Sequence, residues 1–159
     1  MKSHEDHGRY GSAAGTGHYA RLAIMAALSF IAMYALMYAM VDALANVYHN
    51  LNQVYMAGLM AAPMVLIELA LMRSMYPRKA LNAALVAASL VIMLLCWCGI
   101  RKQAAISDQQ FLRSMIPHHA GALLMCRENR LTDPDLQRLC REIVASQQSE
   151  IGLMRSKLR

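Results

Sequence analysis

Charged residues are scarce in this sequence, and their scarcity is the first constraint on what it can encode. Of 159 residues, 16% are Asp, Glu, Lys or Arg and 57% are hydrophobic. Soluble domains carry about 25% charged residues, so an ordinary soluble fold is disfavoured. Aromatic residues are also few, at 6%. No basic run is interleaved with aromatic residues, so we expect no nucleic-acid partner.

Charge is missing from two long stretches and nearly missing from a third. Residues 22–41 and 80–100 contain no charged side chain, and residues 54–72 contain only Glu68. Each stretch is close to the ~20 residues with which a helix crosses ~30 Å of hydrocarbon. We predict three transmembrane helices and hence the lipid bilayer as a partner. Glu68 is expected to face other helices, protonated or hydrogen-bonded to Tyr34 or Tyr38.

Basic residues are distributed unevenly around these stretches. The connection 43–53 has none, whereas six lie before the first span or between the second and third: Lys2, Arg9, Arg21, Arg73, Arg78 and Lys79. Basic loops stay in the cytoplasm. We therefore expect a multi-pass protein of the bacterial inner membrane, with a cytoplasmic N-terminus and a periplasmic C-terminal domain. Arg101 and Lys102 argue weakly for the reverse.

The chain divides into three parts by composition. Residues 1–19 are rich in Gly, Ser, Ala and His without apolar periodicity, which predicts a disordered cytoplasmic tail. Residues 20–100 form the three-helix transmembrane region, and residues 101–159 form a helical hairpin domain. The predicted fold class is all-α: three transmembrane helices followed by a periplasmic two-helix hairpin.

The hairpin is predicted from its helix caps. Ser107 with Gln110 three residues later is a capping box, which starts a helix that runs to about Arg130. Asp133 caps the next helix, and Pro134 suits its first position. So small a hairpin buries too little core alone. It must pack on the membrane-proximal end of its own spans or on a second copy, and we expect a homo-oligomer in which two hairpins form a four-helix bundle.

The stretch MIPHHAGALLMC, residues 115–126, carries the candidate chemistry. At about 100° per residue, five donors fall within roughly a third of the helix circumference: Met115, His118, His119, Met125 and Cys126. On the second helix, Cys140, Gln147 and Met154 repeat every seven residues, and Glu150 flanks them. A hairpin with its midpoint near residue 133 pairs Cys126 with Cys140, His119 with Gln147 and Met115 with Ile151.

This set of side chains suits a soft metal ion. Thioether, thiolate and imidazole ligands favour Cu(I) over hard cations. Zinc remains an alternative through His and Cys, although a tetrahedral zinc site rarely needs methionine. Pro117, inside the helix, leaves the carbonyl of Arg113 without its usual partner.

Two simpler interpretations stay open. Methionine and alanine on one helical face are often core residues, although two adjacent histidines are harder to bury without hydrogen-bond partners. Cys126 and Cys140, if outside the cytoplasm, form either a disulfide or two free thiols. A disulfide would remove both from the ligand set.

The segments FLRSMIPHHAGALLMC and EIVASQQSEIGLM resemble the domain-of-unknown-function 305 family, whose hallmark is Met-x-Pro-His-His followed by a helix ending in EI..M. Residues 46–72 resemble the membrane part of its three-span branch. The resemblance implies a ferritin-like helical fold and, as in some members, copper binding in the periplasm. It also implies Met115, His118, His119, Met125 and Met154 as ligands, with Gln147 and Glu150 at family-pattern positions. Many members carry two hairpins, whereas this chain has one.

We therefore expect a membrane-anchored periplasmic protein that binds Cu(I) and buffers or relays it in copper tolerance. The alternative is a structural or interaction protein whose hairpin only mediates oligomerisation. An enzyme is not expected. A ferritin-like di-iron site uses Glu-x-x-His, and no glutamate in the sequence has a histidine three residues later.

Overall fold

The computed structural model describes the backbone of residues 7–158 and the side chains of residues 17–158. These residues form helices and no strand, which confirms the all-α prediction. The elements are α1 (His7–Leu36), η1 (Met37–Met40), η2 (Leu44–Asn46), α2 (Leu51–Leu71), η3 (Arg73–Met75), α3 (Lys79–Lys102), α4 (Asp108–Glu128) and α5 (Pro134–Lys157). The chain divides into two compact units, one of residues up to 33 with 55–101, the other of residues 34–54 with 102–159.

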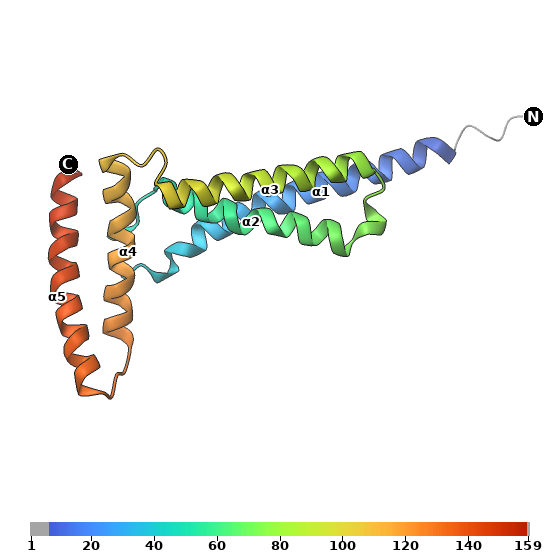
Figure 1. The fold of residues 1–159 in the computed structure, drawn as a ribbon. Coiled ribbons are helices and arrows are strands. Elements are labelled where there is room, and N and C mark those ends of the chain that lie inside the picture. The colour runs from blue at the N-terminus through green and yellow to red at the C-terminus, as the bar shows by residue number, and fades with distance from the viewer. Residues whose placement is uncertain (1–6, 159) are drawn as a thin grey trace, which may run out of the picture. The chain divides into compact units, whose positions relative to one another are not determined.

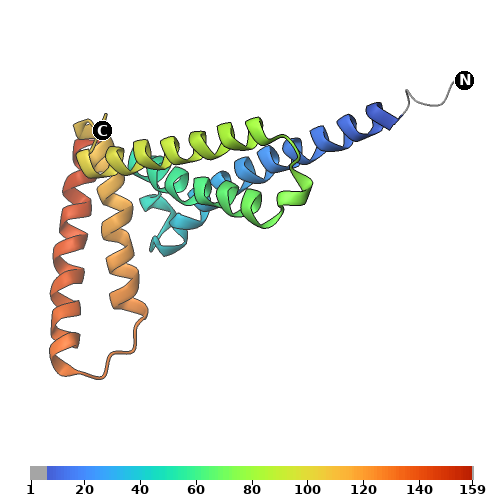
Figure 2. The same ribbon diagram turned by 45° about the vertical axis from the view of Figure 1, so that its right-hand side comes forward.

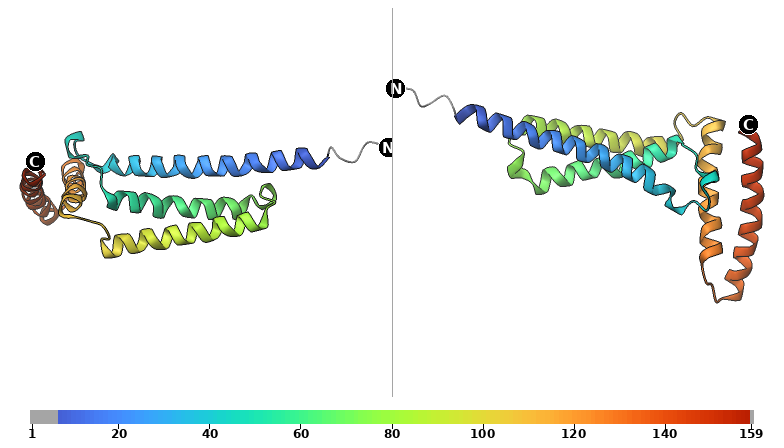
Figure 3. Two further views of the ribbon diagram at one scale, coloured as in Figure 1. Left: turned by 90° about the horizontal axis from the view of Figure 1, so that it is seen from above. Right: turned by 180° about the vertical axis from the view of Figure 1, so that it is seen from behind.

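The first unit contains most of the three long apolar helices, which lie side by side (Figures 1 and 3). Three segments are long and apolar enough to cross a membrane: Gly17–Met40, Leu51–Leu71 and Lys79–Lys102. Helix α1 begins at His7, inside the segment predicted as a disordered tail, and residues 1–6 of that tail lie outside the described part. Small residues bring α2 and α3 together, since a Cβ on Gly58 would stand 2.8 Å from Sγ of Cys96.

Glu68 finds a partner that the sequence did not predict. Tyr76, only 4% exposed, donates from Oη to Oε1 of Glu68 over 3.1 Å. Burial, followed by this hydrogen bond, raises the pKa of Tyr76, so its hydroxyl stays a donor. The prediction that Tyr34 or Tyr38 hydrogen-bonds Glu68 is wrong. Tyr34 Oη instead lies 3.1 Å from Nδ1 of His49, and Tyr38 donates to the carbonyl of Tyr48.

Helices α4 and α5 of the second unit run antiparallel (Figures 1 and 2). Both predicted caps are confirmed. Ser107 Oγ accepts from the backbone N–H of Gln110 at 3.4 Å, and Asp133 accepts from the N–H groups of Asp135 and Leu136. In a complete capping box, the Gln110 side chain would also accept from the N–H of Ser107. Here Gln110 Oε1 accepts from the N–H of Leu51 instead.

The hairpin core is completed by a segment of its own chain. Its most buried residues include Ile116, Leu123 and Ile151, and the partly buried Val41 and Tyr48 pack against this cluster. Two polar contacts tie the same segment down: Arg127 pairs with Asp42 at 3.3 Å, and Arg155 donates to the carbonyl of Ala45 at 2.7 Å. Residues 34–54 therefore cover one side of the hairpin. The compact unit is larger than the predicted domain of residues 101–159.

Candidate functional site

Pro117 shapes the part of α4 that carries the two histidines. The proline has no N–H, so the carbonyl of Arg113, one turn earlier, loses its helical partner. Asn50 supplies a replacement, because its Nδ2 lies 3.5 Å from that carbonyl oxygen. Asn50 is 5% exposed. The Arg113 carbonyl lacks its helical partner as predicted, and its contact with Asn50 joins the 46–53 connection to α4.

His119 follows the proline and turns inward. Its side chain is buried, with 8% of the residue exposed. Nδ1 lies 2.9 Å from the carbonyl oxygen of Met115, and Nε2 lies 2.8 Å from Oε2 of Glu150 on α5. A carbonyl oxygen can only accept, so Nδ1 carries the hydrogen of the first contact. The orientation of the ring is therefore set by α4, and Nε2 is presented to α5.

Glu150 is held from two sides. Its Oε1 accepts a hydrogen bond from Ser146 Oγ at 2.7 Å, and its Oε2 faces the His119 ring. The hydrogen bond from Ser146, followed by that with His119, lowers the pKa of Glu150. The carboxylate therefore stays negative and presents a charged oxygen to Nε2.

The remaining histidine and methionines are divided between core and surface. His118 is exposed, and its ring centroid lies 6.0 Å from that of His119. Met125 is also exposed, at 53%, whereas Met154 is 9% exposed within the hairpin core. Met115 is partly buried against the same core. One imidazole and two thioethers thus lie in or beside the core, and one of each lies outside.

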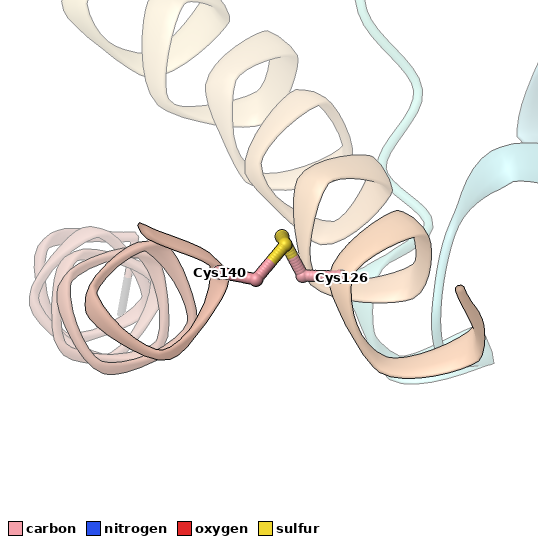
Figure 4. The surroundings of a disulfide bond; sticks show 2 residues. All are labelled: Cys126 and Cys140. Atoms are coloured by element: carbon pink, nitrogen blue, oxygen red, sulfur yellow. A yellow bond between two sulfur atoms is a disulfide. The ribbon is translucent and has the colours of Figure 1, made fainter. Parts of the chain in front are cut away.

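Cys126 and Cys140 form a disulfide between α4 and α5 (Figure 4), with Cα atoms 5.2 Å apart. The predicted facing of these two residues is confirmed, and of the two open alternatives the structure has the bridge. A bridged sulfur is not a thiolate, so both cysteines leave the ligand set in this oxidised state. The remaining two cysteines, Cys96 and Cys98, are free thiols on α3.

The contact of the His119 ring differs from the predicted pair, whereas Met115 packs against the core cluster that contains its predicted partner Ile151. His119 was paired with Gln147, but its ring meets Glu150, almost one turn further along α5. Gln147 is half-buried. Among the residues that the structure describes, no three His, Cys, Asp or Glu side chains form a group that could hold a metal ion. Any site built on this face must therefore draw on methionine sulfur or on a second chain.

Three polar contributors were missed by the reading of the sequence. Ser146 orients Glu150, Asn50 caps the freed carbonyl, and Asp42 pairs with Arg127. Asn50 and Asp42 come from or near the connection between the first two spans. The only signal was the concentration of Asn and Gln at positions 46–53, which is unusual beside two apolar helices.

Comparison with known proteins identifies relatives of both the hairpin and the whole chain. Residues 97–158 match a family described as a domain of unknown function (DUF305). Over 138 residues the chain is 33% identical to the uncharacterized protein L153 of Acanthamoeba polyphaga mimivirus, a match covering 85% of this chain and 89% of the viral protein. No solved structure matches the chain.

Proposed function

This chain belongs to the DUF305 family, and on that premise we propose that it is a membrane-anchored protein that binds Cu(I) in its hairpin and buffers or relays it in copper tolerance. The observation that carries the proposal is the orientation of His119. A histidine that ligates a metal normally donates its other ring N–H to a backbone carbonyl or carboxylate. His119 donates from Nδ1 to Met115 and leaves Nε2 directed at α5.

The thioethers in and beside the hairpin core favour a soft ion. Met154 belongs to the hairpin core, and Met115 packs against that core. Cu(I) accepts imidazole and thioether ligands, whereas zinc sites are built from His, Cys and carboxylates. In the described part of the chain, no group of three such residues is present. Glu150 is 48% exposed in its side chain, so it can move aside when Nε2 takes a metal.

The hairpin is proposed to lie on the side of the membrane opposite the cytoplasm. Two observations support this location. The basic residues Arg73, Arg78 and Lys79 gather in the connection between α2 and α3, which favours that connection as cytoplasmic. Disulfides persist in oxidising compartments and are rare in the cytosol, and the hairpin carries one.

A second copy of the chain is proposed to cover the free face of the hairpin. Met125 directly precedes Cys126, and Leu139 directly precedes Cys140. Because the helices are antiparallel and the two cysteines face each other, the two preceding residues lie on the same side of the hairpin. Residues at seven-residue intervals share that side, which adds Phe111 and His118 on α4 and Leu153 on α5. All five residues are exposed. Two such faces would build a four-helix bundle and bring His118 of each chain inside it.

The free apolar face also favours the second candidate function, an interaction protein whose hairpin only oligomerises. The two candidates differ in what His119 does. In the first it binds a metal, and in the second it serves only as the buried partner of Glu150. Oligomerisation is common to both, so a measurement of oligomeric state cannot separate them.

Titration of the full chain with Cu(I) separates the two candidates. The purified protein in detergent, kept free of oxygen, competes for Cu(I) with a chromogenic chelator. We expect His119→Ala and Met154→Leu each to weaken binding by about tenfold or more, as loss of a ligand should. The matched control is Met60→Leu, which removes a 44%-exposed thioether from α2. Unchanged Cu(I) affinity and stoichiometry in a His118→Ala/His119→Ala variant would leave only the interaction protein.

A further inference from the structure

The connection between α2 and α3 forms one side of a hollow of about 730 Å³ in the first unit. Its lining is partly polar and partly apolar. Arg73, Lys79 and Asn82 lie at the polar part, and Leu66, Ala70 and Val86 line the apolar part. Because α2 and α3 are both long and apolar enough to cross a membrane, the hollow lies where their ends would meet the membrane surface.

The polar part of the hollow is held in place by a hydrogen-bonded frame. Asn82 donates from Nδ2 to the carbonyl of Tyr76 at 2.8 Å and accepts from Tyr19 Oη at 2.7 Å. The rings of Tyr19 and Tyr76 are in contact, with centroids 5.2 Å apart. Since both hydrogen-bonding groups of Asn82 are used, the residue acts as a fixed wall.

The two cations at the hollow form no ion pair with the part of the chain that the structure describes. Within the described residues, the ion pairs involve other side chains, and neither Arg73 nor Lys79 takes part in one. The nearest acidic residue along α2, Glu68, is already engaged by Tyr76 Oη at 3.1 Å. An anion with both a charged and an apolar part would match the hollow, whereas a zwitterionic group would bring its own cation towards Arg73 and Lys79.

We propose that this hollow binds one anionic phospholipid, with its phosphate between Arg73 and Lys79 and an acyl chain along Leu66, Ala70 and Val86. Basic pockets between membrane helices on the cytoplasmic side recognise such headgroups. Arg73 and Lys79, two of the three basic residues that predict a cytoplasmic connection, also line the hollow, so the charge of the hollow agrees with its expected position at the cytoplasmic surface. The lipid is favoured over free phosphate because an inorganic anion has no apolar part that could pack against Leu66, Ala70 and Val86. This inference is independent of copper binding in the hairpin.

Lipid binding to the intact chain tests the proposal. Native mass spectrometry of the protein released from detergent micelles counts bound lipids, with phosphatidylglycerol compared against phosphatidylcholine of the same acyl chains. We expect one phosphatidylglycerol to be retained preferentially. The Arg73→Gln/Lys79→Gln variant should bind phosphatidylglycerol with an association constant lower by roughly tenfold or more, since each basic residue contributes to the attraction. The control Arg101→Gln/Lys102→Gln also removes two positive charges, but at the other end of α3, and should have little effect on phosphatidylglycerol binding.

A second variant keeps both charges and blocks the apolar part. Ala70→Phe places a large side chain on an exposed position of the α2 wall, and it should also displace the lipid while circular dichroism shows unchanged helicity. If inorganic phosphate displaces the bound lipid and Ala70→Phe has no effect on lipid binding, the hollow binds a simple anion and the proposal is overturned. Equal loss in both charge variants would reduce the effect to general electrostatic attraction, and equal retention of the two lipids would also overturn it.

Discussion

His119 on α4 and Glu150 on α5 are joined by a contact of 2.8 Å between Nε2 and Oε2, thirty-one residues apart in the sequence. The opposite edge of the imidazole is fixed by the carbonyl of Met115, and the opposite oxygen of the carboxylate is fixed by Ser146. The contact is therefore the middle of a chain of hydrogen bonds that links the two helices.

The two adjacent histidines should differ in their contribution to stability. His119→Ala removes a buried ring and leaves its partners without a donor, so we expect a loss of about 1–3 kcal/mol in the free energy of unfolding. His118→Ala alters an exposed position and should cost less than about 0.5 kcal/mol. Thermal unfolding of the full chain in detergent, followed by circular dichroism, measures both. Equal losses would contradict the inward and outward placement of the two rings.

The stability contributed by Glu150 should depend on pH. Its pKa is lowered in the fold by Ser146 and then by His119. A carboxyl of lowered pKa stabilises the fold above its unfolded value of about 4.3, and that stabilisation disappears as the pH falls through the lower folded value. Glu150→Gln should therefore lower the unfolding temperature at neutral pH but not in strong acid. Glu142→Gln, an exposed glutamate of α5, is the control. A deficit that is the same at both pH values would contradict this origin.

Reduction of the disulfide should destabilise the hairpin. The bridge closes a loop with a sequence separation of 14, for which the loop-entropy relation gives about 3 kcal/mol. A Cys126→Ser/Cys140→Ser variant should unfold at a lower temperature and should not respond to a reductant, whereas the native chain should respond. Cys96→Ser and Cys98→Ser, which alter the free thiols of α3, should keep the response. A native chain that is indifferent to reductant would contradict a structural role for the bridge.

Asn50 and Pro117 should be energetically coupled. Asn50→Ala leaves the Arg113 carbonyl without a donor, at a cost of about 1–3 kcal/mol that includes its other hydrogen bonds. Pro117→Ala restores the helical N–H, so Asn50→Ala should cost less in that background. A double-mutant cycle on unfolding free energies should give a coupling of about 1 kcal/mol. Additive effects would mean that the 3.5 Å contact contributes nothing.

Much of the architecture follows from local sequence signals. The three apolar helices were predicted from the absence of charge, and the hairpin was predicted from Ser107, Asp133 and Pro134. These features depend on residues close together in the chain, so periodicity and capping suffice to find them. The facing of Cys126 and Cys140 followed as well, because the two lie near the turn, where an error in register has little length over which to grow.

Contacts far from the turn could not be predicted in the same way. The ring of His119 meets Glu150 and not Gln147, because a side chain can reach either of two residues about one turn apart on the facing helix, and spacing alone does not choose between them. The role of residues 34–54 also had no local signal. Asn50 and Asp42 show their purpose only when the chain brings them to Arg113 and Arg127.

The sequence by itself determined the three apolar helices, the two caps of the hairpin and the gathering of nitrogen and sulfur donors on α4, although α1 begins earlier than predicted. Tertiary structure decided which of those donors remain available: it bridged the two cysteines, buried His119 against Glu150 and left His118 at the surface. The physical reason is that helix periodicity orders side chains around one axis. Which side of that axis is covered depends on the second helix and on the segment 34–54, and both reach α4 only through contacts distant in the chain.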